Sequence, residues 1–288
     1  MNVKFDCYEC ILKQIVATSR EIGKDEESRK RILREMLSEV MANAEQLTPP
    51  EMAMKFHAIC TRETGNDDAY REIKIQSTKI GLELLDELRR IVKESEDPLK
   101  CAIRLAIAGN IIDYGVNPNF QLSQAKKQIL EAVNTPCDDE ALTDLTRRIK
   151  QAETVFYLLD NCGEAVLDRL VIEQIPGKVT LGVRGEPIYN DVTIREEEES
   201  GLTGYPVVTT GCAVPGVSLP LIPDDFRQAL EQSNLVISKG QGNYESLENS
   251  FTCRPIYFLL RVKCPVISQQ LNSPMGAMQI VGKNLNQI

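Results

Sequence analysis

The stretch TVFYLLDNCGEA, residues 154–165, decides the fold of this chain. Its residues 155–159 form a short apolar run, which is typical of a strand that is covered on both faces of a parallel sheet. Apolar residues then recur at helical spacing over 166–175, so the two segments predict a strand, a tight turn and a helix. In open α/β sheets, ligands bind at the carboxyl ends of strands. Asp160 and Asn161 therefore stand where chemistry is expected, although such a pair also fits a simple helix cap.

The chain divides into two regions that differ in the spacing of their apolar residues. Residues 1–150 carry apolar side chains at helical spacing in one segment after another, which predicts an all-helical domain. Over residues 151–288, β-branched runs alternate with helical or loop segments, and this favours an α/β domain with a mostly parallel, doubly wound sheet. Strands are expected at 154–159, 178–183, 206–210, 235–239, 256–260 and 265–268. The predicted fold class is therefore α/β, with a domain boundary near residue 150.

Composition argues against several classes of function. The 288 residues carry a net charge of −9, which opposes binding to nucleic acid or to anionic membranes and favours a small-molecule partner. No apolar run approaches the roughly 18 residues of a membrane span, and residues 1–6 lack a signal-peptide pattern, so a cytoplasmic protein is expected. Nine scattered cysteines, an odd number, fit reduced thiols. Because His57 is the single histidine, a histidine-based triad is discounted.

A second carboxylate follows the next predicted strand. Asp191 lies in the loop 184–193, before another helix, and its position matches that of Asp160 after the first strand. Two carboxylates and the Asn161 amide oxygen from neighbouring strand ends would give a hard divalent cation oxygen ligands and leave positions for water and a phosphate. Mg²⁺ or Mn²⁺ suits this set, whereas zinc prefers His or Cys ligands. Taken alone, Asn190 and Asp191 also fit a turn and a helix cap.

The fourth predicted strand ends in a lysine that is followed by two closely spaced glycines. Residues 239–245 read KGQGNYE, and glycines let backbone amides approach an anion closely. Lys239 closes the strand at the same expected edge of the sheet, and this position favours a contact with phosphate. A Gly-x-Gly alone is weak evidence, because the Walker pattern is absent. Lys263 is a second candidate cation, although exposed lysines are common in connecting segments.

Cys7 and Cys10 form a Cys-x-x-Cys pair near the start of the first helix. Such a pair holds a metal or forms a redox disulfide, but a structural zinc site needs four ligands. His57 and Cys60 are spaced to supply the other two. The competing interpretation is a pair of ordinary buried or surface thiols.

Taken in order, the motifs of this chain resemble those of the metal-dependent damage-control phosphatases, the former domain-of-unknown-function 89 family, and in particular its subfamily I with a CxxC motif. The resemblance spans nearly the whole chain and implies that Asn110 and Asp113 face the site from the helical region. The matching motifs are Cys7-x-x-Cys10, Gly65-Asn66-Asp67-Asp68-x-Tyr70, Gly109-Asn110-x-x-Asp113, Asp160-Asn161-x-Gly163-Glu164, Gly185-x-Pro187-Ile188-x-Asn190-Asp191 and Lys239-Gly240-Gln241-Gly242-Asn243-Tyr244-Glu245.

The resemblance implies a helical N-terminal region packed on a Rossmann-like α/β/α sandwich. Carried over residue by residue, it makes Asp160, Asn161 and Asp191 the metal ligands, with Mn²⁺ or Ni²⁺ as the expected cofactor and Mg²⁺ or Co²⁺ as alternatives. Lys263 matches a substrate-contacting lysine, although the Arg-Thr-x-Lys signature of a related subfamily is absent. The remaining substrate-binding residues that the resemblance implies are Asn161, Lys239, Gln241, Gly242, Asn243, Tyr244 and Glu245.

The expected function is hydrolysis of small phosphorylated metabolites, with damaged (oxidised) purine nucleotides or their precursors as the favoured class. Asp160, Asp191 and Lys239 are the expected catalytic residues. The metal held by the two carboxylates would polarise the phosphoryl oxygens and activate water, and Lys239 would neutralise charge on the transferred group. A different mechanism has Asp160 attacking phosphorus directly, although the Asp-x-Asp pattern of aspartyl-phosphate enzymes is absent.

Two other functions compete with this one. A carboxyl methyltransferase that uses S-adenosylmethionine has been proposed for relatives of this family, but it demands a glycine-rich loop after the first strand. Here that loop holds a single glycine, Gly163. The non-enzymatic alternative is a thiol-based metal or redox sensor centred on Cys7 and Cys10.

Overall fold

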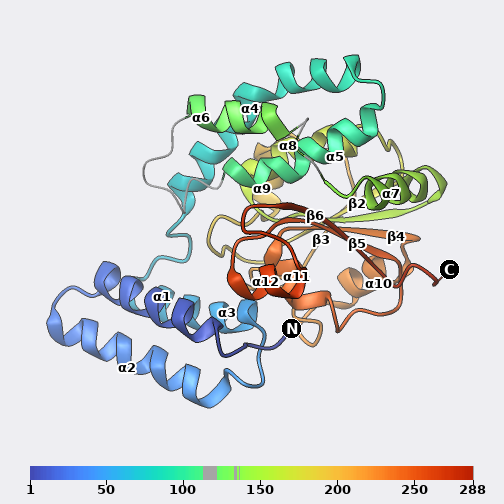
Figure 1. Cartoon of the computed structure of the whole chain (residues 1–288). Coiled ribbons are helices and arrows are strands. Elements are labelled where there is room, and N and C mark those ends of the chain that lie inside the picture. Colours follow the sequence, from blue (N-terminus) through green and yellow to red (C-terminus); the bar gives the residue numbers. More distant parts are fainter. Residues whose placement is uncertain (113–121, 133–134, 136, 288) are drawn as a thin grey trace.

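A six-stranded sheet lies at the centre of the computed structural model, which describes residues 1–112, 122–132, 135 and 137–287 (Figure 1). The strand order is β3-β2-β1-β4-β5-β6, with β1 to β5 parallel and β6 antiparallel to β5. The α/β fold class and the mostly parallel sheet are confirmed. The strands are β1 (Val155–Leu158), β2 (Val179–Val183), β3 (Val207–Thr209), β4 (Leu235–Lys239), β5 (Ile256–Arg261) and β6 (Met278–Lys283).

Strand β1 lies between β2 and β4, and each of its side chains is buried. Val155 pairs with Val179 on one side and with Leu235 on the other. Apolar side chains on both faces suit this central place, because helices cover both faces of a parallel sheet. The chain proceeds from β1 to β3 in one direction and from β4 to β6 in the other, so the order reverses between β1 and β4. Ligands of open α/β sheets bind at such a reversal.

Helices cover both faces of the sheet, and a further group extends to one side of it (Figure 1). Helices α4, α5 and α7 share a core with β1 and α8 on one face, and α10 to α12 pack on the other. Helices α1 to α3 pack around a core of their own. The helices are α1 (Cys7–Ile22), α2 (Glu26–Asn43), α3 (Pro49–Thr64), α4 (Arg71–Glu94), α5 (Pro98–Ala108), the 3₁₀ helix η1 (Gly109–Ile112), α6 (Leu122–Ala132), α7 (Asp139–Gln151), α8 (Cys162–Ile172), α9 (Ile194–Glu199), α10 (Asp224–Gln232), α11 (Gln241–Leu247) and α12 (Pro265–Gln270).

The start of helix α3 connects the α1–α3 group to the sheet domain. Thr48 caps the helix and Glu51 completes a capping box, which satisfies backbone donors that the first turn leaves free. The second carboxylate oxygen of Glu51, Oε1, accepts a hydrogen bond of 2.7 Å from the hydroxyl of Ser218 in the loop after β3. The first turn of α3 is therefore fixed beside the carboxyl edge of the sheet.

One predicted strand is wrong. Residues 265–268 form the first part of helix α12, and the last strand of the sheet is β6, further along the chain. Pro265 occupies the first helical turn, where its missing N–H costs nothing, and the Cys264 thiol caps the helix by accepting from the amide of Ile267 at 3.5 Å. The other five predicted strands are confirmed within two residues.

The division into domains at residue 150 stays a prediction. Helix α7 ends at Gln151 and β1 begins at Val155. The sequence changes there from apolar residues at helical spacing to β-branched runs. The core between α4, α5, α7 and the sheet is continuous across that point. Among the described helices, none combines the length and the apolar composition that crossing a bilayer requires.

Candidate active site

A cavity of about 360 Å³ lies between helices α1 and α3 and the carboxyl edge of the sheet, at the reversal of strand order. Loops after β1, β2, β3, β4 and β5 contribute to it, so residues far apart in the sequence meet there. Its lining consists of Gln14, Pro49, Pro50, Ala53, Tyr70, Asp160, Asn161, Tyr189, Asn190, Asp191, Pro215, Gln241, Gly242, Glu245 and Lys263.

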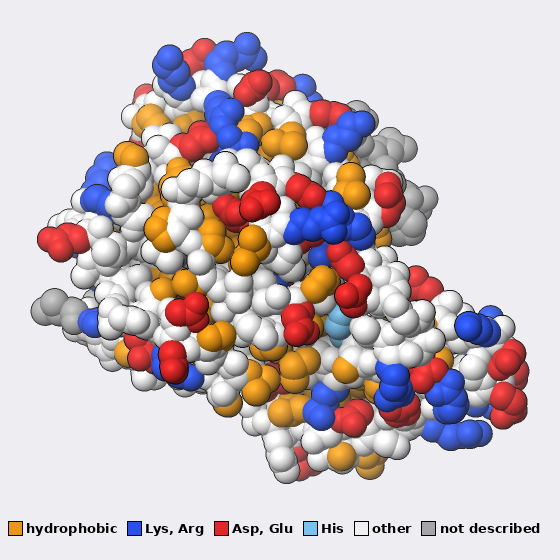
Figure 2. Space-filling view, turned by 180° about the vertical axis from the view of Figure 1, so that it is seen from behind, with side chains coloured by type: hydrophobic (Ala, Val, Ile, Leu, Met, Phe, Trp, Pro, Cys, Tyr) orange, Lys and Arg blue, Asp and Glu red, His pale blue; other side chains and the backbone are white. Residues whose placement is uncertain are grey.

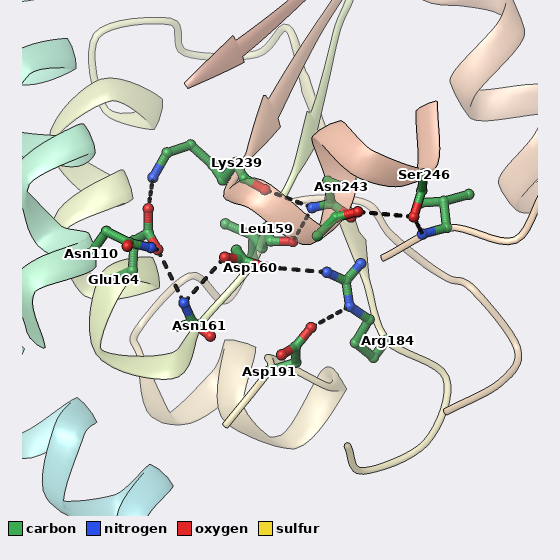
Figure 3. A network of polar contacts seen from close by, with 12 residues as sticks. Asn110, Leu159, Asp160, Asn161, Glu164, Arg184, Asp191, Lys239, Asn243 and Ser246 are labelled. Atoms are coloured by element: carbon green, nitrogen blue, oxygen red, sulfur yellow. Dashed lines mark hydrogen bonds and ion pairs between the residues drawn. The ribbon is translucent and has the colours of Figure 1, made fainter. Parts of the chain in front are cut away.

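The three predicted metal ligands come together in this cavity (Figure 3). Asn161 and Asp191 form an isolated antiparallel bridge, so the loop after β2 runs beside the end of β1. The amide of Val192 donates to the carbonyl of Asp160 at 2.9 Å, and the amide of Cys162 donates to the carbonyl of Asn190 at 3.0 Å. These backbone bonds fix the relative positions of Asp160, Asn161 and Asp191.

Arg184, at the end of β2, ties the two carboxylates together. Its Nε donates to Oδ2 of Asp191 at 2.7 Å, and its Nη2 lies 3.4 Å from Oδ1 of Asp160 (Figure 3). Burial raises the pKa of the Asp160 carboxyl well above its usual range, and the charges of Asp191 and Glu164 raise it further, while Arg184 acts in the opposite direction. The guanidinium is 1% exposed, so it offsets the repulsion of two buried carboxylates.

The side-chain oxygens of Asp160, Asn161 and Asp191 are suited to bind a hard divalent cation. The amide nitrogen of Asn161 donates to Oδ2 of Asp160 at 3.1 Å and lies 3.4 Å from Oε2 of Glu164, which leaves the amide oxygen for a ligand. In Figure 3 the oxygens of Asn161 and Asp191 are directed toward the same space beside Asp160. Two carboxylates and an amide oxygen are ligands of the kind that Mn²⁺ and Mg²⁺ prefer.

Gly240, which follows β4, lets the next loop approach this site closely. Its φ of +79° lies in the left-handed region, and a Cβ atom there would come within 1.8 Å of Oδ2 of Asp160. Only glycine fits both conditions. The start of helix α11 therefore lies directly against the Asp160 carboxylate.

Lys239 does not line the cavity. Its ammonium group points away from the cavity, and Nζ lies 2.5 Å from Oε1 of Glu164 (Figure 3). The same Nζ lies 2.7 Å from Oδ1 of Asp168 and 3.1 Å from the carbonyl of Ala106. Burial acts to lower the pKa of Lys239, but the charges of Asp168 and Glu164 raise it above its ordinary value. This placement differs from the expected contact with phosphate, because alternate side chains of a strand point to opposite faces and this one meets two buried carboxylates.

Of the other predicted substrate-binding residues, Asn243 and Tyr244 also lie outside the cavity lining. Asn243 donates to the carbonyl of Lys239 at 2.7 Å and to that of Leu159 at 3.2 Å, so it joins helix α11 to the ends of β4 and β1. The hydroxyl of Tyr244 accepts from Gln270 at 3.0 Å, and its ring packs edge-on against Phe258. Both side chains hold the loop in place.

Four of the predicted substrate-binding residues, which follow β4 and β5, line the cavity: Gln241, Gly242, Glu245 and Lys263. The Gln241 amide connects two of them, because its Nε2 donates to Oε1 of Glu245 at 2.8 Å and its Oε1 accepts from the backbone amide of Lys263 at 3.0 Å. Glu245 is 9% exposed. The cavity therefore has a buried carboxyl group and a lysine on this side.

Several lining residues were not predicted from the sequence. Tyr189 has a φ of 45°, in the left-handed region, and its hydroxyl accepts a 2.8 Å hydrogen bond from Gln14 of α1. Its ring packs edge-on against Tyr70 with 5.6 Å between centroids. No local sequence pattern predicts these contacts, because they join residues that are far apart in the chain. Arg184, which is not part of the lining, was also not predicted, although it directly follows β2, the neighbour of β1 in the sheet.

The cysteine pair is not assembled into a metal site. Cys7 is half-buried and Cys10 is exposed, and both are free thiols. Among the described residues there is no cluster of three or more His, Cys, Asp or Glu side chains able to hold a metal, so His57 and Cys60 do not complete a four-ligand zinc site with them. The roles of Cys7 and Cys10 stay a prediction.

The helical region contacts the site through Asn110. Its Nδ2 donates to Oε2 of Glu164 at 2.7 Å, next to the Asn161 amide (Figure 3). Asp113, expected to face the site as well, lies outside the described residues. Asn110 therefore contacts the predicted metal ligands indirectly, through Glu164, whose Oε2 also lies 3.4 Å from the amide nitrogen of Asn161.

Several known proteins are similar to this chain over nearly its whole length. The model of the damage-control phosphatase ARMT1-like domain matches residues 3–278. A protein named damage-control phosphatase from Pyrococcus horikoshii is 28% identical over 96% of this chain and 97% of its own length. Another of that name, from Archaeoglobus fulgidus, is 29% identical over 96% of this chain and 98% of its own. A crystal structure of a DUF89 family protein from P. horikoshii superposes with a TM-score of 0.85 at 28% identity, covering 97% of this chain and 98% of that one.

Proposed function

Because this chain belongs to the family of the damage-control phosphatase ARMT1-like domain, we propose that it is a metal-dependent phosphatase of small phosphorylated metabolites. The observation that carries the proposal is the meeting of Asp160, Asn161 and Asp191 in one cavity at the reversal of strand order. Two relatives that match nearly their whole length are named damage-control phosphatases.

The excess of negative charge in the cavity lining indicates that a phosphate ester needs a cation in order to bind there. The charged residues of its described lining are Asp160, Asp191, Glu245 and Lys263, so carboxylates outnumber ammonium groups. A phosphate dianion would be repelled by this lining alone. Mn²⁺ or Ni²⁺, with Mg²⁺ or Co²⁺ as alternatives, would be held by Asp160, Asn161 and Asp191. A bound divalent cation polarises phosphoryl oxygens and makes water a better nucleophile.

The residues around the cation then have separate tasks. Arg184 holds Asp160 and Asp191 in place. Glu164 turns the Asn161 amide so that its oxygen faces the ligand side. Lys263, which lines the cavity, takes the contact with the phosphoryl group that the sequence assigned to Lys239.

The size of the cavity and the molecular surface favour a small substrate. About 360 Å³ lies at the small end of the range found for metabolite pockets. On the face seen in Figure 2, acidic and basic side chains are interspersed. A polymeric nucleic acid would need a continuous basic surface. Damaged (oxidised) purine nucleotides or their precursors are the favoured class, and the half-buried rings of Tyr70 and Tyr189 offer apolar surface to such a base.

A direct test is hydrolysis of a panel of phosphate monoesters with Mn²⁺, Ni²⁺, Co²⁺ and Mg²⁺, each compared with a chelator control. Asp191→Asn should remove the metal-dependent activity, and Asp224→Asn, an exposed carboxylate on α10, is the matched control that should keep it. Tight binding of S-adenosylmethionine without metal and without ester hydrolysis would contradict the proposal. A rapid quench with borohydride distinguishes the two routes, because it would reduce an Asp160 aspartyl phosphate to homoserine, whereas direct attack by water leaves Asp160 unmodified.

A further inference from the structure

A buried carboxyl group that plays no part in the metal site faces the cavity. Glu245 lies on helix α11, after β4, whereas the metal ligands follow β1 and β2. In the strand order β2-β1-β4-β5, Glu245 and Lys263 therefore stand on the opposite side of the reversal from Asp160 and Asp191. A phosphate ester bound between the two sides would have its phosphoryl group near the metal ligands and its ester oxygen within reach of α11.

The position of the Glu245 side chain is fixed. Its Oε1 accepts from Nε2 of Gln241 at 2.8 Å, and Gln241 is itself held by the backbone amide of Lys263. The backbone carbonyl of Glu245 accepts from the amino group of Met1. A carboxyl group that is 9% exposed and held in this way keeps one orientation toward the cavity.

The surroundings of Glu245 favour its protonated form. Burial raises its pKa to about 7, although the hydrogen bond from Gln241, the Met1 amino group and the Lys263 ammonium act to lower it. The other titratable groups that face it are the thiols of Cys7 on α1 and Cys264 before α12. At neutral pH a large fraction of the protein therefore carries a proton on this carboxyl group, which suits a group that gives a proton away.

We propose that Glu245 is the general acid that protonates the leaving-group oxygen during hydrolysis of the phosphate ester. The assignment rests on the proposed phosphatase function. The oxygen of water bonds to phosphorus while the ester P–O bond breaks, and the electron pair of that bond stays on the leaving oxygen. The proton of the Glu245 carboxyl converts this oxygen to a hydroxyl group. A proton of the attacking water then returns to Glu245, so that ester and water give alcohol and phosphate.

The test uses two esters that differ in their need for an acid. The leaving group of p-nitrophenyl phosphate is stable as an anion near neutral pH, whereas the alkoxide of glycerol 2-phosphate must be protonated. Glu245→Gln keeps the size and the partner of the side chain but has no acidic proton. It should lower kcat on glycerol 2-phosphate about 10²-fold or more while changing kcat on p-nitrophenyl phosphate less than about threefold. Asp224→Asn, the exposed carboxylate of α10 that serves as the control above, should leave both rates unchanged.

The pH dependence gives a second readout. The kcat of the wild-type protein on glycerol 2-phosphate should fall as pH rises through about 7, because Glu245 loses its proton there, and this limb should be flat in Glu245→Gln. Equal losses on the two esters, or a wild-type rate on the alkyl ester, would overturn the assignment. Metal-dependent hydrolysis of p-nitrophenyl phosphate by the wild type would uphold the phosphatase function in either case. Failure of every ester of the panel would overturn both.

Discussion

Substitution of Lys239 tests whether its ammonium group is paired with the buried carboxylates of Glu164 and Asp168 and does not contact phosphate. Lys239→Met replaces the ammonium by an apolar group of similar length and leaves Glu164 and Asp168 without their cation. All three side chains are 1% exposed or less, so solvent does not screen the loss. Breaking a buried pair in this way costs about 3–5 kcal/mol. Burial raises the pKa of Asp168 to about 7 although the charge of Lys239 acts to lower it. Without that charge the pKa rises further, so the carboxyl group takes up a proton even at pH 8 and the cost lies toward the lower end.

The assay is urea unfolding followed by circular dichroism, in a chelating buffer at pH 8. Lys239→Met should lose about 3 kcal/mol of unfolding free energy, which corresponds to a decrease in Tm of about 5 °C for a chain of this size. Lys263→Met is the matched control, and it should change stability by less than about 0.5 kcal/mol while it lowers kcat. Adding Glu164→Gln to Lys239→Met should restore part of the loss. Wild-type stability of Lys239→Met together with a lost kcat would refute this reasoning and return Lys239 to the phosphate.

Three further predictions concern the site itself. Gly240→Ala should lower Mn²⁺ affinity measured by calorimetry by about tenfold or more, because a Cβ 1.8 Å from Oδ2 of Asp160 must displace that ligand; unchanged affinity would show that the loop moves freely. Asp191→Asn should reduce Mn²⁺-dependent kcat by about 10²-fold or more, and an unchanged rate would remove Asp191 from the ligand set. Between its ordinary value of 4.5 and about 7, Glu245 keeps a proton in the folded state that the unfolded chain has lost, so unfolding free energy should fall as pH rises through this window. Glu245→Gln should make that slope shallower, and an identical slope in urea titrations would contradict the burial argument.

The sequence predicted the central strands, and the meeting of Asp160 with Asp191 at one edge of the sheet, because both depend on local patterns. Residues 155–158 are apolar on both faces, which only a covered strand satisfies, and Asp160 and Asp191 each follow a strand end. Parallel strands bring such ends together whatever the rest of the chain does. Strand β6 was missed because it is an edge strand, antiparallel and only partly buried, whose pattern is weak.

The direction of a side chain at the end of a strand was harder to predict. Lys239 and Gly240 are neighbours, but only Gly240 lies against Asp160, while the lysine meets carboxylates of helix α8. A shift of one position reverses the face of the sheet. The contact between Gln14 and Tyr189 spans 175 positions of sequence, and it depends on how α1 lies over the sheet edge. Such contacts follow from tertiary packing and leave no local trace.

The location of the cation tests the central claim most directly. Crystals soaked in Mn²⁺ should show one strong anomalous peak bounded by the oxygens of Asp160, Asn161 and Asp191, the kind of ligands that Mn²⁺ prefers. The same peak should be absent from crystals of Asp191→Asn. Anomalous density that appears only at Cys7 and Cys10, or that persists unchanged in Asp191→Asn, would contradict the account.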